Sequence, residues 1–162
     1  MGLARWVDER LVPKVVVATQ TRVVEVAVDE AGRWVPSTPL IAVPADPDRL
    51  WHLAAALSAP PVTAWALRIS GGTALAPDAL KLSAAQVRQI PAPVDDAAWD
   101  YGAAAFHAAQ HAETAEVRRG HLVVMGRAMV AAYDVGEPDE LLAWWTDRLG
   151  RRDARDSRPG PS

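Results

Sequence analysis

The first ninety residues alternate between short apolar runs and turn-forming residues. Residues 11–18 are rich in valine, and residues 23–28 alternate apolar side chains with Glu25 before a turn. This pattern predicts two β-strands. Residues 33–35 are expected to return as the second arm of a hairpin. Prolines on both sides of residues 40–43 are typical of an edge strand, because proline cannot donate to a central ladder.

Signals for helix starts follow these strands. Asp46 followed by Pro47 is a typical start, since the carboxylate accepts a backbone hydrogen bond and proline suits the first helical position. A second short helix is predicted over residues 62–68, and a short strand over residues 80–82. Residues 83–86, Ser-Ala-Ala-Gln, then fit a capping box.

The second half of the chain has helical spacing. Three helices are predicted, over residues 96–111, 114–133 and 139–149, and Gly150 is expected to end the last of them. Their apolar stripes should face inward. The predicted core residues of this half are Trp99, Phe106, Met125, Met129 and Trp145.

The fold class predicted from these elements is α+β, with a helical C-terminal segment. Residues 11–94 form the mixed strand and helix domain, and residues 95–150 form a helical extension. Residues 151–162 are polar, contain two prolines and are expected to be a disordered tail.

Composition and charge exclude several classes of function. The 162 residues contain no cysteine, which rules out disulfides, thiol nucleophiles and cysteine-ligated metals, and they contain no asparagine. No cofactor-binding loop and no catalytic grouping is visible. The net charge is −3, and residues 91–150 carry ten Asp/Glu against four Arg. This acidic half argues against DNA contacts beyond residue 94, and we expect it to pack on a partner.

Three polar groupings are candidate sites. His107 and His111 share a helix face, but alanine follows His107 where a metalloprotease has glutamate, so a solvated face is favoured. Residues 70–73, Ser-Gly-Gly-Thr, suit a turn better than a phosphate loop. Residues 19–22, Thr-Gln-Thr-Arg, separate two apolar strands. Gln and Arg pair with adenine and guanine edges, although a solvated connection is the alternative interpretation.

The order of several segments resembles a known family. The segments are the valine run after Lys14, the Thr-Gln-Thr-Arg string, Leu-Trp-His-Leu-Ala at 50–54, Leu-Lys-Leu-Ser at 80–83 and Ile-Pro-Ala-Pro at 90–93. Together they are similar to the C-terminal specificity domain of adenine-specific bacterial DNA methyltransferases, including the TaqI-like domain and type I restriction specificity subunits. The resemblance covers residues 11–94.

This resemblance implies a DNA target-recognition domain without catalysis of its own. S-adenosylmethionine is expected in a partner methyltransferase catalytic domain or subunit, and double-stranded DNA is the expected ligand. We expect a cytoplasmic location and no membrane partner. The predicted DNA contacts are Lys14, Gln20, Arg22, Arg33, Arg68 and Lys81.

The alternative is a protein-interaction module. In that case the acidic helices and an exposed Trp144 beside Trp145 would dock a partner. The DNA-recognition hypothesis and the protein-interaction hypothesis differ in where they place the basic residues. DNA binding requires them on one concave face, whereas an interaction module would scatter them.

Overall fold

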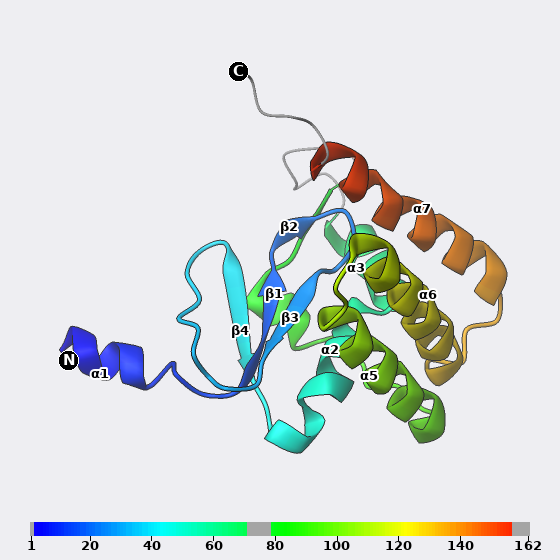
Figure 1. Cartoon of the computed structure of the whole chain (residues 1–162). Helices are drawn as coiled ribbons and strands as arrows, with labels where there is room; N and C mark the ends of the chain where they lie inside the picture. Colours follow the sequence, from blue (N-terminus) through cyan, green and yellow to red (C-terminus); the bar gives the residue numbers. More distant parts are fainter. Residues whose placement is uncertain (1, 71–78, 157–162) are drawn as a thin grey trace.

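The computed structural model describes residues 2–70 and 79–156, and places a small antiparallel sheet against a layer of helices (Figure 1). The predicted α+β class is confirmed. In chain order the elements are α1 (Leu3–Asp8), β1 (Lys14–Ala18), β2 (Gln20–Thr21), β3 (Val26–Asp29), β4 (Leu40–Pro44), a 3₁₀ turn (Pro47–Arg49), α2 (Leu50–Ser58), α3 (Pro60–Ser70), β5 (Leu80–Lys81), α4 (Ala84–Val87), α5 (Asp96–Gln110), α6 (Ala115–Ala132) and α7 (Pro138–Asp156).

The main sheet has three strands in the order β3-β1-β4, and both pairings are antiparallel. Val15 of β1 lies opposite Val28 of β3 and Val43 of β4, so these side chains share the inner face that packs on α2. The predicted edge position of β4 is confirmed. The prediction of a hairpin arm over residues 33–35 is wrong: the carboxylate of Asp29 accepts the backbone N–H groups of that segment and draws it out of the ladder.

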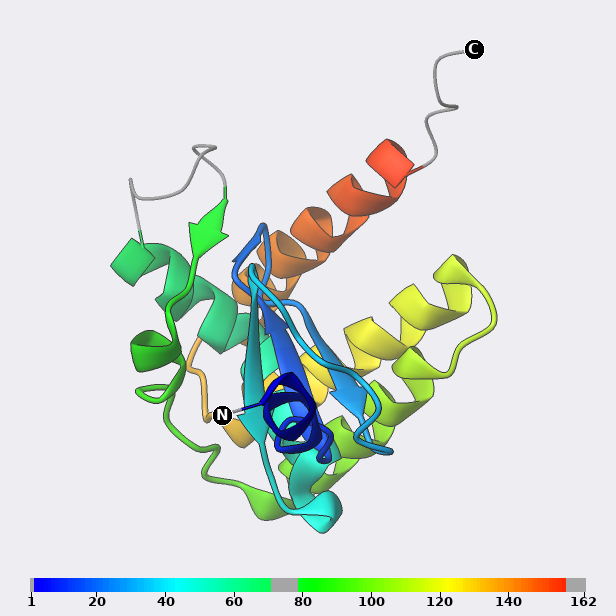
Figure 2. The same cartoon turned by 90° about the vertical axis from the view of Figure 1, so that its left-hand side faces the viewer.

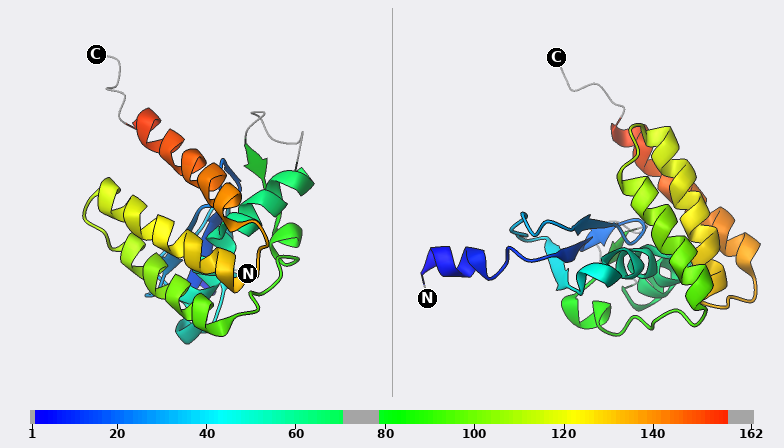
Figure 3. Two further views of the ribbon diagram at one scale, coloured as in Figure 1. Left: turned by 90° about the vertical axis from the view of Figure 1, so that its right-hand side faces the viewer. Right: turned by 60° about the horizontal axis from the view of Figure 1, so that its bottom comes forward.

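The helices form a layer in which α2 lies on the sheet, α5 on α2, and α6 between α5 and α7 (Figures 1 and 3). Figure 2 shows α3 and β5 on one side of the central strands and the α5–α6 hairpin on the other. A single core cluster includes Val15, Leu57, Phe106, Met129 and Trp145. One continuous core therefore joins the two parts that the sequence divides at residue 94, and the inward-facing stripes are confirmed.

Gln110 joins α5 to the free edge of β3. Its side-chain Oε1 accepts from Val28 N at 2.7 Å, and its Nε2 donates to Val28 O at 2.9 Å. The amide thus makes the two hydrogen bonds that another strand would make.

Local capping fixes several helix starts as predicted. Asp46 accepts from Asp48 N at 3.1 Å, and Ser83 forms the capping box with Gln86. Helix α7, in contrast, runs through Gly150 to Asp156, so the predicted helix end at Gly150 is wrong. Residues 157–162 lie outside the described part.

The remaining features are helix α1, the end of α3 and the character of the helices. Helix α1 was not predicted, and it extends away from the body of the molecule (Figures 1 and 3). Ser70 ends α3, and the remainder of the predicted 70–73 loop lies outside the described residues. Within residues 2–70 and 79–156, no helix combines the length and apolar character that crossing a bilayer requires.

Candidate functional site

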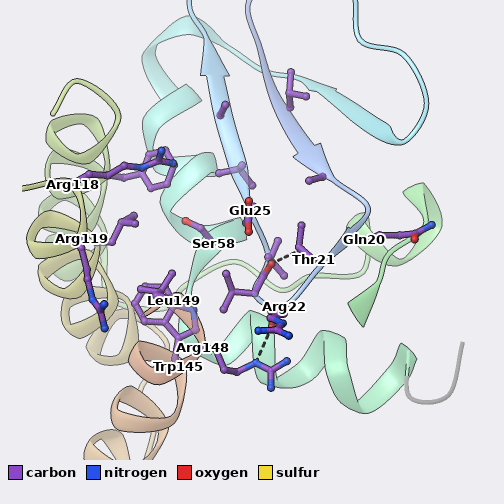
Figure 4. A pocket seen from close by; sticks show the side chains of 18 of the residues that line it. Gln20, Thr21, Arg22, Glu25, Ser58, Arg118, Arg119, Trp145, Arg148 and Leu149 are labelled. Atoms are coloured by element: carbon purple, nitrogen blue, oxygen red, sulfur yellow. Dashed lines mark hydrogen bonds between the residues drawn. The ribbon is translucent and has the colours of Figure 1, made fainter. Parts of the chain in front are cut away.

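A groove with a volume of about 870 Å³ runs from the outer face of the main sheet, past the start of β3, to α6 and α7 (Figure 4). Its walls come from strands early in the chain and helices late in the chain. One end is rich in arginine and the other is apolar, so the groove presents two kinds of chemistry to a ligand.

Four arginines line the polar end. Arg22 comes from the loop between β2 and β3, Arg118 and Arg119 from α6, and Arg148 from α7 (Figure 4). Among the described residues that line the groove, Glu25 is the one carboxylate. Guanidinium groups therefore outnumber carboxylates along this wall, although the whole chain is acidic.

The loop that carries Arg22 is held by side chains from three elements. Thr21 Oγ1 donates to Val23 O, and Val24 N donates to the buried Thr63 Oγ1 of α3 at 3.1 Å. Arg148 Nε donates to the carbonyl oxygen of Arg22 at 2.8 Å and ties α7 to the loop. The arginine end is thus built on a fixed backbone.

The apolar end lies on the outer face of the sheet. Val16 stands opposite Ala27, and Ala18 stands opposite Leu40. These side chains are small except Leu40, and Trp34 borders them with 45% of its surface exposed. We call the surface formed by Val16, Ala18, Ala27, Trp34 and Leu40 the apolar shelf.

A buried ion pair positions Trp34. Lys14 Nζ donates to Asp29 Oδ2 at 2.7 Å, and Asp29 accepts from Arg33 N at 3.0 Å and from Trp34 N at 2.8 Å. Burial disfavours the charged carboxylate, but the hydrogen bonds from Lys14, Trp34 and Arg33 outweigh it and lower the pKa of Asp29 below 3.8.

The same ion pair corrects one predicted DNA contact. Lys14 is only 1% exposed, and its Nζ also donates to the carbonyl oxygens of Arg10 and Val12. A side chain enclosed in this way cannot reach a phosphate, so the prediction for Lys14 is wrong. Its role is structural.

The other predicted contacts are divided between two ends of the sheet. Gln20 and Arg22 line the groove. Lys81 is exposed and lies directly opposite Gln20 in the β2–β5 pair, and Arg68 is exposed in the last helical turns of α3, but neither lines the groove. Arg33 follows β3 at the opposite end of the sheet.

The sequence prediction missed Arg118, Arg119 and Arg148, because the half of the chain that contains them is acidic. A signal was available. That half has four arginines, and three of them line the groove. The acidic average of this half therefore concealed three arginines that the fold brings to one groove.

Other sequence candidates do not form a site. The ring centroids of His107 and His111 lie 4.4 Å apart, and Trp51 contacts His107 edge-on and His111 at a tilt. In the part of the chain that the structure describes, no three His, Asp or Glu side chains form a metal-binding group. Trp144 is partly buried with Arg148 over its ring, so the expectation of an exposed Trp144 is wrong. Trp145 is 1% exposed, as predicted for a core residue.

The groove thus brings polar side chains from strands and helices together around a space with room for a ligand. The indole Nε1 of Trp145, a residue that lines the groove, is buried without a hydrogen-bond partner among the described residues. One donor in the groove wall is therefore unused. No protein-family model, curated protein or solved structure matches the chain.

Proposed function

We propose that the chain is a non-catalytic recognition unit that binds double-stranded DNA through the groove. It acts with a separate methyltransferase catalytic domain or subunit, which binds S-adenosylmethionine, in the cytoplasm. The observation that carries this proposal is the convergence of Gln20 and Arg22 with the arginines of α6 and α7 on one groove. The resemblance of residues 11–94 to specificity domains also supports it.

The chemistry of the groove suits both parts of DNA recognition. Guanidinium groups bind phosphate oxygens, often through two parallel hydrogen bonds. Gln20 is exposed at the groove and has an amide of the kind that pairs with an adenine edge. Arginine–phosphate contacts would set the position of the strand, and Gln20 would supply discrimination between bases.

The net charge of −3 makes binding by the chain alone weak. The arginines must attract DNA against the repulsion of the acidic helices, and salt screens both effects. If the four groove arginines each neutralise one phosphate, the slope of log K against log salt concentration is about −3.6.

The test is a fluorescence-anisotropy titration of the full chain with a short labelled DNA duplex over a range of salt concentrations. Arg118→Ala should weaken binding and make the slope less negative by about 0.9. Arg127→Ala is the matched control, because Arg127 is exposed on the same helix and does not line the groove. Equal effects of the two substitutions, or no binding at low salt, would contradict the proposal.

The absence of catalysis is tested separately. We expect the chain not to bind S-adenosylmethionine, because its sequence has no cofactor loop and no catalytic Pro-Pro motif. Isothermal titration calorimetry with the cofactor gives the answer. Micromolar binding would show that this chain is itself a methyltransferase or part of its cofactor site.

A further inference from the structure

We propose that the groove holds one unpaired nucleotide, with its phosphate among the arginines and its base on the apolar shelf against Trp34. This inference rests on the proposed function and specifies the ligand of the same site. It predicts that the chain prefers DNA with an unpaired nucleotide to a perfect duplex.

The two ends of the groove match the two parts of a nucleotide. The arginine end suits a phosphate, and the apolar shelf suits the flat face of a base. A volume of about 870 Å³ lies within the range of clefts that enclose small ligands, which is roughly 300–1,000 Å³. Both ends belong to one cavity.

The outer sheet face contributes small apolar side chains to the wall of the groove, and Val16 among them is only 7% exposed. At three neighbouring positions, Val16, Ala18 and Ala27, the side chains are short, whereas Trp34 and Leu40 stand beside them. This part of the groove wall is therefore apolar and includes an exposed indole. An exposed tryptophan beside a basic groove is the arrangement in which nucleic-acid bases stack on proteins.

Trp34 is held in place before any ligand arrives. Its backbone N–H is bound by Asp29, and Asp29 is fixed by the buried Lys14. A stacking residue on a fixed backbone loses less conformational freedom on binding than one on a loose loop.

The face of a base is hidden within a duplex, where each base stacks on its neighbours. A base that stacks on Trp34 must therefore leave the stack, and this step is easiest for a base without a pairing partner. The geometry of the shelf thus selects an unpaired nucleotide, while the arginines accept any phosphate.

The experiment compares two labelled probes with the full chain: a perfect duplex and the same duplex with one unpaired nucleotide. We expect the second probe to bind about tenfold more tightly, an advantage in the range of one base–aromatic stack. Trp34→Ala should remove this difference, and Trp34→Phe should keep most of it. Trp6→Ala is the matched control, because Trp6 is similarly exposed and lies on α1 away from the groove.

A second variant tests the shelf without removing an aromatic ring. Ala18→Leu adds bulk to the apolar shelf, so it should also abolish the preference for the unpaired probe while binding to the perfect duplex is kept. Thermal unfolding of each variant shows whether it is folded. Unlabelled mononucleotide is added as a competitor of the unpaired probe. Its effect shows whether the groove binds a free nucleotide as well as a nucleotide within a strand.

The outcomes separate the two proposals. Equal binding of both probes, or a preference that survives both Trp34→Ala and Ala18→Leu, overturns this inference while the effect of Arg118→Ala still supports DNA binding. Mononucleotide that competes as well as the unpaired probe overturns the assignment to a strand. If neither probe binds, both this inference and the proposed function are wrong.

Discussion

The buried ion pair between Lys14 and Asp29 joins the first strand of the sheet to the segment that carries Trp34. Lys14 gives its three donated hydrogen bonds to Asp29 and to two backbone carbonyls, and Asp29 accepts two backbone N–H groups in addition. Each partner compensates for the desolvation of the other, so the pair functions as a unit.

Lys14→Met should therefore destabilise the fold by about 3–5 kcal/mol, because it leaves the Asp29 carboxylate buried without its cation. Urea unfolding measures the change, and Lys81→Met at an exposed position is the control. A loss below about 1 kcal/mol, the range of an exposed ion pair, would show that the pair is open to water.

The lowered pKa of Asp29 gives this pair a pH dependence. The carboxylate contributes stability above 3.8, and that contribution is lost as the pH falls through its lower folded-state pKa. In Lys14→Met, burial without the cation raises the pKa of Asp29, so stability should fall at a higher pH than in the unmodified chain. Identical acid-unfolding curves for the two proteins would refute this.

The phenol of Tyr133 makes the stability of the fold depend on pH in the alkaline range as well. Burial raises the pKa of its phenol to about 12, and the hydroxyl donates to Pro91 O at 3.0 Å. The neutral phenol contributes stability fully below pH 10, the ordinary pKa, and loses it as the pH rises towards 12. Stability should therefore fall less steeply over this range in Tyr133→Phe. Tyr101→Phe, at an exposed position, should behave as the unmodified chain.

At the scale of elements, α6 is the helix that sets the positions of its neighbours. It packs against α5 on one side and against α7 on the other. A Cβ added at Gly126 would lie 2.9 Å from Trp145 Cζ3 and 3.3 Å from Pro60 Cγ. The glycine therefore allows α7 to approach closely enough for Arg148 to reach Arg22.

Two glycines of α6 give a matched pair of substitutions. Gly120→Ala meets no atom within 4 Å and should stabilise the chain by about 0.5–1 kcal/mol through helix propensity. Gly126→Ala gains the same propensity but forces the indole and the proline apart, an overpacking cost of about 1–3 kcal/mol. Thermal melts should thus move in opposite directions. A melting temperature that rises in both would show that α7 can shift freely.

At the scale of the whole molecule, Gln110 couples the helical part to the sheet. Gln110→Ala leaves the N–H and C=O of Val28 without their partner. We expect a loss of about 1–3 kcal/mol, the usual cost of an unsatisfied buried polar group. Gln89→Ala, at an exposed position, is the control in the same denaturation assay. An equal, small effect at both positions would mean that water replaces the amide at the strand edge.

Features that depend on residues close together in the chain could be predicted from the sequence, whereas features that depend on distant contacts could not. The capping box at Ser83 and the stripe that contains Phe106 depend on residues within a few turns of each other, and both were found. The segment at residues 33–35 was misread, because the side chain of Asp29 competes with the backbone ladder. Alternation of apolar residues carries no sign of such a competition.

The site was harder to predict than the elements. Gln20 and Arg22 were identified from their residue types, but the groove also needs Arg118 and Arg148, which are about a hundred residues away in the chain. No local pattern links these positions. Lys14 failed for a related reason: its burial depends on a carboxylate and carbonyls that only the folded chain brings to it.

The bond from Arg148 to the backbone of Arg22 has a consequence for biosynthesis. A ribosome makes the strands and the shelf first, and the last wall of the groove emerges only when α7 has been translated. A nascent chain in which α7 is not yet made therefore has the first strands, but it lacks the Arg148 side chain that bonds to the loop after β2. This wall of the groove is therefore completed only after the strands have been made, because α7 follows them in the chain.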